Sequence, residues 1–266
     1  MREKTAPTLE AIQHAPMHEI VYDRLRDALS SGEILPGQRL VIRDLADMLG
    51  TSVMPIREAL RRLEAENAVV AIGGRTLSVP ILTASEYEEI GMIRAELEGL
   101  AAFEAASVIT TQEINQIEEY ANLSNQAACD LDGEAAALYN RLFHQGINNA
   151  SRKPLLLKMI DSLWLRLGPQ MAYTFKKAMV AQKWEAESYG VFHPHKQAID
   201  ALRTGNPTAA KAAIMYDISC VCRSIVSYMK SREAKEAMKT SPKPVRGKKK
   251  NGIEIPQLSL PKEIIQ

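Results

Sequence analysis

The chain has 266 residues, of which 46% are hydrophobic and 24% are charged, with a net charge of +1. That length and apolar content suffice for two ordinary globular domains, each with its own core. No apolar run approaches the length needed to cross a bilayer, and residues 1–16 lack the apolar centre of a signal peptide. We therefore expect a cytoplasmic protein with no membrane partner.

The positive charge is concentrated at the C-terminal end. Residues 230–266 contain ten Lys or Arg and four Asp or Glu, so the rest of the chain carries a net charge of −5. Any contact with DNA must then come from a local cluster of positive groups, because the folded part has no general basic field.

The N-terminal part predicts three helices followed by a hairpin. Residues 1–16 show no periodicity and are expected to form a flexible arm. Apolar residues at helical spacing then predict helices over about 17–32, 42–49 and 51–66, and short apolar runs on either side of Gly73 and Gly74 predict two strands, at 69–72 and 76–79. Three helices with a tight turn between the second and third, followed by a hairpin, are typical of a winged helix-turn-helix, which we predict for residues 17–80.

The rest of the folded chain is predicted to be all-α, so the fold class overall is mainly α. Strand signals vanish after Thr83, and a helical domain is expected over residues 84–232. Thr110 and Glu113 fit a capping box at the start of one helix. Residues 233–266 contain too few apolar side chains to fold and are expected to form a disordered basic tail. The amphipathic stretches that predict the helices run approximately over 85–106, 111–131, 134–149, 154–181, 195–204 and 207–232.

The third helix of a winged helix-turn-helix enters the major groove, so the residues at its N-terminal end and outer face are candidates for DNA contact. Arginines there can bind phosphate or take a bidentate bond to guanine, Ser52 can bind phosphate, and Met54 can touch a thymine methyl group. A single arginine is as easily a solvated surface residue; the prediction depends on the whole set. The candidates are Ser52, Val53, Met54 and Arg57 at this helix, together with Arg43 at the start of the second helix and Arg75 at the tip of the wing.

Polar side chains also fall on the inward faces of helices in the second domain. Arg94 shares an apolar stripe with Ile90 and Leu97, and a buried guanidinium needs an anion. Four more inward positions are occupied by polar residues, and such amide, imidazole and carboxylate groups can together hold a divalent cation such as Zn²⁺, Ni²⁺ or Mn²⁺. Periodicity alone favours an alternative, in which the carboxylate pairs with an arginine and the histidines are hydrogen-bonded core residues. The four positions are Asn140, His144, His195 and Asp217.

The motifs of the first domain resemble those of a known family. EILPGQRL at residues 33–40, LADMLGTS at 45–52 and MPIREALRRLE at 54–64 are similar to the GntR-family DNA-binding domain, and the similarity covers roughly residues 17–80. The family commonly has a basic residue where this chain has Val53. We therefore expect an operator preference that differs from the family's common one.

The second domain resembles the FCD ligand-binding domain of the FadR-type subfamily over roughly residues 84–230, on IRAELEGLAA at 93–102, NRLFH at 140–144 and HKQAI at 195–199. The resemblance implies a metal held by one Asp and three His, with a small organic acid bound beside it and in part by Arg94. Here Asn140 stands where an Asp is usual and Asp217 where a His is usual, so weaker metal binding is expected. The ligands carried over are Asn140, His144, His195 and Asp217.

Together the two resemblances imply a ligand-responsive transcription regulator. It would act as a homodimer on double-stranded operator DNA, as a repressor of a metabolic operon that a small organic acid relieves, and it would not be an enzyme. One alternative is a metal-dependent enzyme, although no nucleophile, general base or glycine-rich cofactor loop accompanies the site. The other is a nonspecific nucleic-acid-binding scaffold that depends on the lysines at 248–250.

Overall fold

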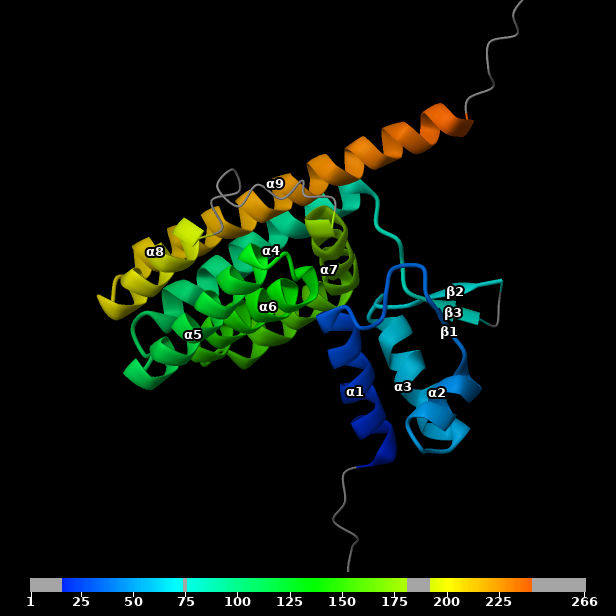
Figure 1. Ribbon diagram of the computed structural model, residues 1–266. Coiled ribbons are helices and arrows are strands. Elements are labelled where there is room, and N and C mark those ends of the chain that lie inside the picture. The colour runs from blue at the N-terminus through cyan, green and yellow to red at the C-terminus, as the bar shows by residue number, and fades with distance from the viewer. Residues whose placement is uncertain (1–15, 74–75, 181–191, 241–266) are drawn as a thin grey trace, which may run out of the picture.

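The computed structural model describes residues 16–73, 76–180 and 192–240. In these residues the chain forms nine helices and one small sheet, arranged as an N-terminal unit beside a larger helical bundle (Figure 1). The mainly-α fold class is thereby confirmed. The arm at 1–15 and the basic segment at 241–266 lie outside the described residues, and so does Arg75.

The N-terminal unit has the expected order of elements, with one addition. An extra strand, β1 (Arg39–Leu40), precedes α2 (Ile42–Met48) and pairs antiparallel with β3 (Thr76–Ser78). Arg39 lies opposite Ser78 and Leu40 opposite Leu77, and β3 also pairs with β2 (Val70–Ile72), so the sheet has the order β1-β3-β2. Two residues are too short for an alternating pattern, which explains why the sequence did not predict this strand. The elements are α1 (Met17–Ser31), β1 (Arg39–Leu40), α2 (Ile42–Met48), α3 (Val53–Ala65), β2 (Val70–Ile72) and β3 (Thr76–Ser78).

The core of this unit explains how α3 is held. Ile56, Leu60 and Leu63 lie on one face of α3 and are at most 1% exposed, packed against Leu29 of α1. Gly32 ends α1 with φ of +78° and donates its N–H to the carbonyl oxygen of Leu29, a left-handed conformation that glycine adopts without strain. The opposite face of α3 is left free for a partner.

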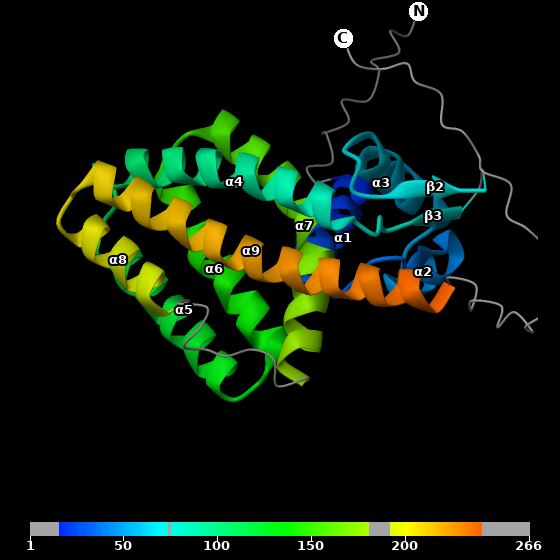
Figure 2. The same ribbon diagram turned by 90° about the horizontal axis from the view of Figure 1, so that it is seen from above.

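The described part of the helical domain contains six helices, and two of them, α4 (Ala84–Ala105) and α9 (Pro207–Thr240), run beside each other along it (Figure 2). The capping box of Thr110 and Glu113 is confirmed, and a second one, Thr83 with Glu86, starts α4. None of the described helices is both long and apolar enough to span a membrane. The six are α4 (Ala84–Ala105), α5 (Thr111–Cys129), α6 (Gly133–Ala150), α7 (Pro154–Val180), α8 (Phe192–Arg203) and α9 (Pro207–Thr240).

The expected boundary of the tail at residue 233 is too early, because α9 continues to Thr240. The first residue past the expected boundary has a structural role: Glu233 Oε1 accepts a hydrogen bond of 3.0 Å from the backbone N–H of Ala84, at the start of α4. That N–H lies in the first turn, where a helix offers it no internal acceptor, so a carboxylate is favourable there.

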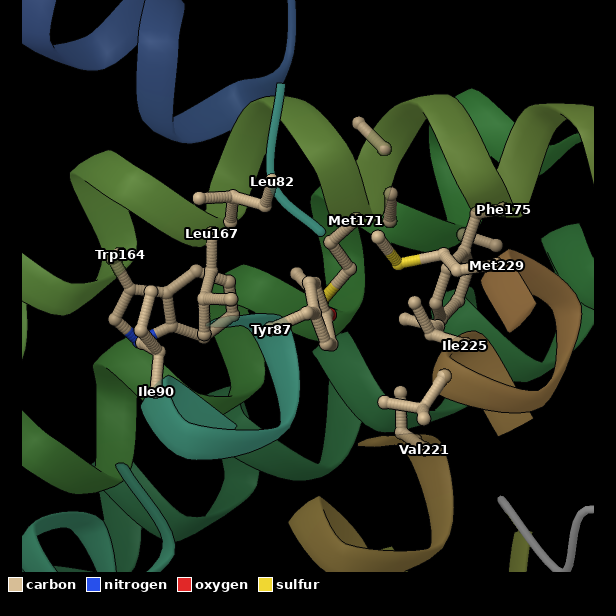
Figure 3. Close-up of a cluster of buried hydrophobic side chains, with 14 of the residues drawn as sticks. Leu82, Tyr87, Ile90, Trp164, Leu167, Met171, Phe175, Val221, Ile225 and Met229 are labelled. Atoms are coloured by element: carbon tan, nitrogen blue, oxygen red, sulfur yellow. The ribbon is translucent and has the colours of Figure 1, made fainter. Parts of the chain in front are cut away.

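A large apolar cluster joins α4, α7 and α9 (Figure 3). Trp164, Ile90 and Leu167 lie at one end of it, and Phe175 and Met229 lie at the other. Leu82, from the segment that links the two domains, packs into the same cluster. The link between the domains is therefore anchored in the core of the helical domain.

The two domains also touch directly, through α1 and α7. Leu165 of α7 belongs to the core of the N-terminal domain. Gly168, on the same helix, lies so close to α1 that a Cβ atom there would meet the carbonyl oxygens of Ser30 and Leu29 at 2.6 and 2.9 Å. Because these are backbone atoms, neither helix can yield without moving as a whole.

Gly168→Ala is therefore expected to lower the free energy of unfolding by about 1–3 kcal/mol, the usual cost of overpacking. Chemical denaturation would measure it, with Lys158→Ala at an exposed position of α7 as the control. If Gly168→Ala proved as stable as the control, the close approach of α1 to α7 would be wrong.

Candidate functional site

Most of the residues predicted to contact DNA are exposed on α2 and at the start of α3. Arg43 of α2, Ser52 at the N-cap of α3, and Met54 and Arg57 in α3 are all exposed, and Met54 is 63% exposed although it is apolar. Val53 differs, because its side chain is half-buried against the domain core. Val53 is thus better placed to fix the start of α3 than to contact bases.

A groove of about 440 Å³ runs between α3 and the sheet, and we call it the α3–wing groove. Arg57 and Arg61 line it, one turn apart on α3. Arg61 was not among the candidates, although its i+4 spacing from Arg57 on the polar face was visible in the sequence. Arg62 has another role: its guanidinium lies 3.6 Å from the centroid of the Tyr22 ring and pairs with Glu66.

The helical domain brings together three of the four expected metal ligands from three helices. His144 of α6, His195 of α8 and Asp217 of α9 are each 1% exposed, and one ligand atom from each lies within 4.8 Å of the others. Asp217 Oδ2 is 3.1 Å from His144 Nε2, and Asp217 Oδ1 is 3.5 Å from His195 Nε2. Asn140 lies one turn before His144 on α6 and is 2% exposed. We call these four residues the buried cluster.

Several polar atoms of the buried cluster have no hydrogen-bond partner among the described residues. They are both carboxylate oxygens of Asp217, both ring nitrogens of His195, Nδ1 of His144 and Oδ1 of Asn140. The approaches of Asp217 to the two imidazoles are ion-pair contacts whose geometry is not that of a hydrogen bond. Buried polar atoms without partners are costly unless something else satisfies them. Imidazole nitrogens, a carboxylate and an amide oxygen are ligands that a divalent transition metal accepts, so the residues fit a metal ion.

A second carboxylate, Glu98 of α4, adjoins the buried cluster and was not singled out by the sequence pattern. Glu98 is fully buried, and its Oε2 lies 2.9 Å from His144 Nδ1. Its Oε1 accepts a hydrogen bond of 2.9 Å from Trp164 Nε1 and another from Arg94 Nε. The signal was present, since Glu98 follows the inward-facing Arg94 by four residues, a spacing that puts opposite charges side by side.

The charges of the site stabilise one another against burial. Burial by itself would raise the pKa of Glu98, but Arg94 and His144 lower it to about 2. Burial likewise opposes ionisation of Asp217, yet His195 and His144 hold its pKa well below the usual value. The pKa of His144 is raised, because Glu98 and Asp217 outweigh the burial that would lower it. The site therefore keeps its carboxylates ionised at neutral pH.

This arrangement answers two questions that the sequence left open. Asp217 faces two imidazoles and, in the part of the chain that the structure describes, pairs with no arginine. The anion that the buried Arg94 requires is Glu98, so an external acid is not needed to neutralise it. The guanidinium also stacks over the Trp164 ring, at 4.0 Å from the ring centroid.

The N-terminal domain is a three-helix unit with an exposed third helix and a small antiparallel wing, and it is joined to a helical bundle with a buried polar cluster. This architecture defines a DNA-binding transcription regulator of the winged helix-turn-helix class. Residues 18–79 match the model of the bacterial regulatory proteins of the gntR family, and residues 89–219 match the model of the FCD domain. The chain belongs to the GntR family of regulators, in the group with a C-terminal FCD domain.

Curated relatives and solved structures agree with this assignment. The chain is 35% identical over 170 residues to the HTH-type transcriptional regulator McbR of Escherichia coli, covering 64% of this chain and 77% of that protein. The structure of E. coli McbR/YncC matches with a TM-score of 0.69 at 27% identity, over 83% of this chain and all of that chain. A probable D-xylose utilization operon transcriptional repressor of Paenarthrobacter nicotinovorans is 24% identical over 194 residues, covering 72% and 80% of the two chains.

Proposed function

We propose that the protein is a homodimeric repressor whose binding to operator DNA is weakened by a small organic acid in the helical domain. The observation that carries this proposal is the position of α7 between the two sites. Trp164 of α7 binds Glu98 beside the buried cluster, and Gly168, one turn later, packs against α1. A change at the cluster that moves α7 also moves the DNA-binding domain.

The proposal assigns a divalent metal to the buried cluster, with His144, His195 and Asp217 as ligands and Asn140 as a weaker one. A bound Zn²⁺, Ni²⁺ or Mn²⁺ would supply a positive centre that accepts a carboxylate oxygen. Glu98 fixes the orientation of His144 by its contact with Nδ1, as outer carboxylates commonly do for ligand histidines. Arg94 keeps Nη2 buried and without a hydrogen-bond partner, so it can take the second carboxylate oxygen of the acid.

We expect the purified protein to hold close to one metal ion per chain and Asp217→Ala to hold essentially none. Asp217 is the only carboxylate of the buried cluster, so its removal takes away the anionic ligand. The isosteric Asp217→Asn should lose the metal in the same way, and it decides the question if the fold of Asp217→Ala is damaged. Elemental analysis after dialysis measures both, with Asp200→Ala at an exposed position of α8 as the control. Equal metal content in all variants would refute the assignment.

The DNA-binding part of the proposal places two copies of α3 in successive half-sites of a palindromic operator. The test is to select bound sequences from a random duplex library and to titrate the selected duplex by fluorescence anisotropy, with and without acetate, lactate or citrate. We expect the selected duplex to bind at least about 10³-fold more tightly than a scrambled one, and at least one acid to weaken binding. An acid that strengthens binding would reverse the proposed sign, and no preference for any sequence would refute the regulator.

The same titration decides the role of the lysine-rich segment. A chain that ends at residue 240 keeps α9 entire and should keep its operator preference, whereas a nonspecific scaffold would lose binding. The enzyme alternative receives no support from the relatives, which are named as transcription regulators.

A further inference from the structure

A polar cavity lies at the joint of the two domains, apart from the buried cluster. Its volume is about 50 Å³, and α1, α6 and α7 all contribute to its wall. We call it the joint cavity. Trp164 connects it to the surroundings of the buried cluster, since the same indole donates a hydrogen bond to Glu98. The residues that matter for its chemistry are Arg26, Asp27, Arg141, Asn148, Asp161 and Trp164.

The four charged residues of the joint cavity fall into two groups. Arg26 is already neutralised, because its guanidinium lies 3.1 Å from Asp23 and 3.3 Å from Asp27. Arg141 and Asp161 are not: neither has an oppositely charged atom within 4.0 Å in the described part of the chain. Nε of Arg141 is moreover buried without a hydrogen-bond partner. The cavity thus presents one unpaired cation and one unpaired anion to whatever fills it.

Desolvation outweighs the neighbouring opposite charges at both Arg141 and Asp161. Burial raises the pKa of Asp161 above its usual value, although Arg26 and Arg141 act in the opposite direction. Burial likewise lowers the pKa of Arg141, although Asp27 and Asp161 oppose it. Arg141 is half-buried, so its charge gains more from a charged partner than a fully solvated charge does, whereas the side chain of Asp161 is exposed at the rim of the cavity.

We propose that the joint cavity is a second ligand site and that it takes a small zwitterion of the α-amino-acid class. A simple anion would neutralise Arg141 but would be repelled by the carboxylate of Asp161. A simple cation would neutralise Asp161 but would be repelled by the guanidinium of Arg141. A molecule with a carboxylate and an ammonium group satisfies both at once. The amide of Asn148, which is 4% exposed, supplies a further hydrogen-bonding group in the wall.

The size of the cavity limits the ligand to the smallest members of that class. One water molecule requires about 10–15 Å³ of such volume, so about 50 Å³ holds only a few heavy atoms. Glycine and alanine fit this limit, and an amino acid with a long or aromatic side chain does not. Because such a ligand touches α1, α6 and α7 together, it would tie the DNA-binding domain to the helical domain without using the metal.

Isothermal titration calorimetry on the metal-free full-length chain, without DNA, tests this site independently of the proposed function. Glycine and L-alanine are expected to bind saturably at one site per chain. Acetate and methylammonium, which each carry only one of the two charges, are expected to bind at least about tenfold more weakly, as is L-tryptophan because of its size. Binding of acetate as tight as that of glycine would mean a simple anion site and would overturn the proposal, as would the absence of any heat with glycine.

Two substitutions locate the site. Asp161→Asn keeps the shape of the side chain and is expected to weaken glycine binding at least about tenfold, and Arg141→Met is expected to do the same. Asp200→Asn, which removes a carboxylate from an exposed position of α8, should bind as the parent chain does. If circular dichroism shows that Arg141→Met fails to fold, Asp161→Asn alone decides the question: unchanged glycine affinity in that variant would place any binding elsewhere and refute the site.

Discussion

Arg57→Ala is expected to weaken binding to the selected operator duplex by about 10- to 100-fold. Arg57 is exposed on α3 and lines the α3–wing groove together with Arg61. One bidentate contact between an arginine and a base is worth about 1–3 kcal/mol of discrimination, which corresponds to that range. Fluorescence anisotropy with the operator and with a scrambled duplex would measure the change for each.

The comparison of the two duplexes tells base contact from phosphate contact. If Arg57 contacts a base, affinity for the operator falls more than affinity for the scrambled duplex; if it contacts phosphate, both fall by a similar factor. Arg203→Ala is the matched control, since it removes the same charge from α8, where the guanidinium pairs with Glu118. Full operator affinity in Arg57→Ala would show that α3 does not read DNA through this face.

Glu98→Ala is expected to lower the free energy of unfolding by about 3–5 kcal/mol, the usual cost of removing one partner of a buried ion pair. The carboxylate is fully buried, and its loss leaves Arg94 without its counter-ion and His144 without its contact at Nδ1. Urea denaturation of the metal-free protein measures this effect without any contribution from metal binding.

Glu96→Ala provides the matched control on the same helix. Glu96 is exposed and lies 3.5 Å from Lys211, and a surface pair of this kind contributes about 0–1 kcal/mol. Similar losses for the two variants would contradict the arrangement described for Glu98, because the effect would then come from α4 in general and not from the buried ion pair.

The sequence predicted most of the fold because long amphipathic helices carry a strong periodic pattern. The elements that it did not predict are those with little pattern of their own. The strand at Arg39 and Leu40 exists only because it pairs with β3. The last turns of α9 follow Glu233, whose carboxylate binds the start of a helix 149 residues earlier in the chain. Both features depend on contacts between distant segments, which local propensity does not report.

The residues of the candidate sites were likewise predicted only in part. Periodicity placed Asn140, His144, His195 and Asp217 in the interior, where the structure finds them. It considered Arg94 as a single buried charge and therefore expected an external anion, whereas the anion stands one turn further along the same helix, at Glu98. The joint cavity was beyond the reach of any pattern, because Arg26, Arg141 and Asp161 come from three helices in two domains and meet only in the folded chain.

The central claim is that the buried cluster controls DNA binding, and the operator affinity of the protein with and without metal tests it most directly. Chelator-treated protein is compared with protein reloaded with Zn²⁺, Ni²⁺ or Mn²⁺. Each preparation is titrated with and without acetate, lactate or citrate. We expect at least one combination of metal and acid to change the dissociation constant by about fivefold or more, the usual range of coupling between distant sites, and Asp217→Asn to abolish that change. Identical operator affinity in every condition, with metal shown to be bound, would contradict the claim.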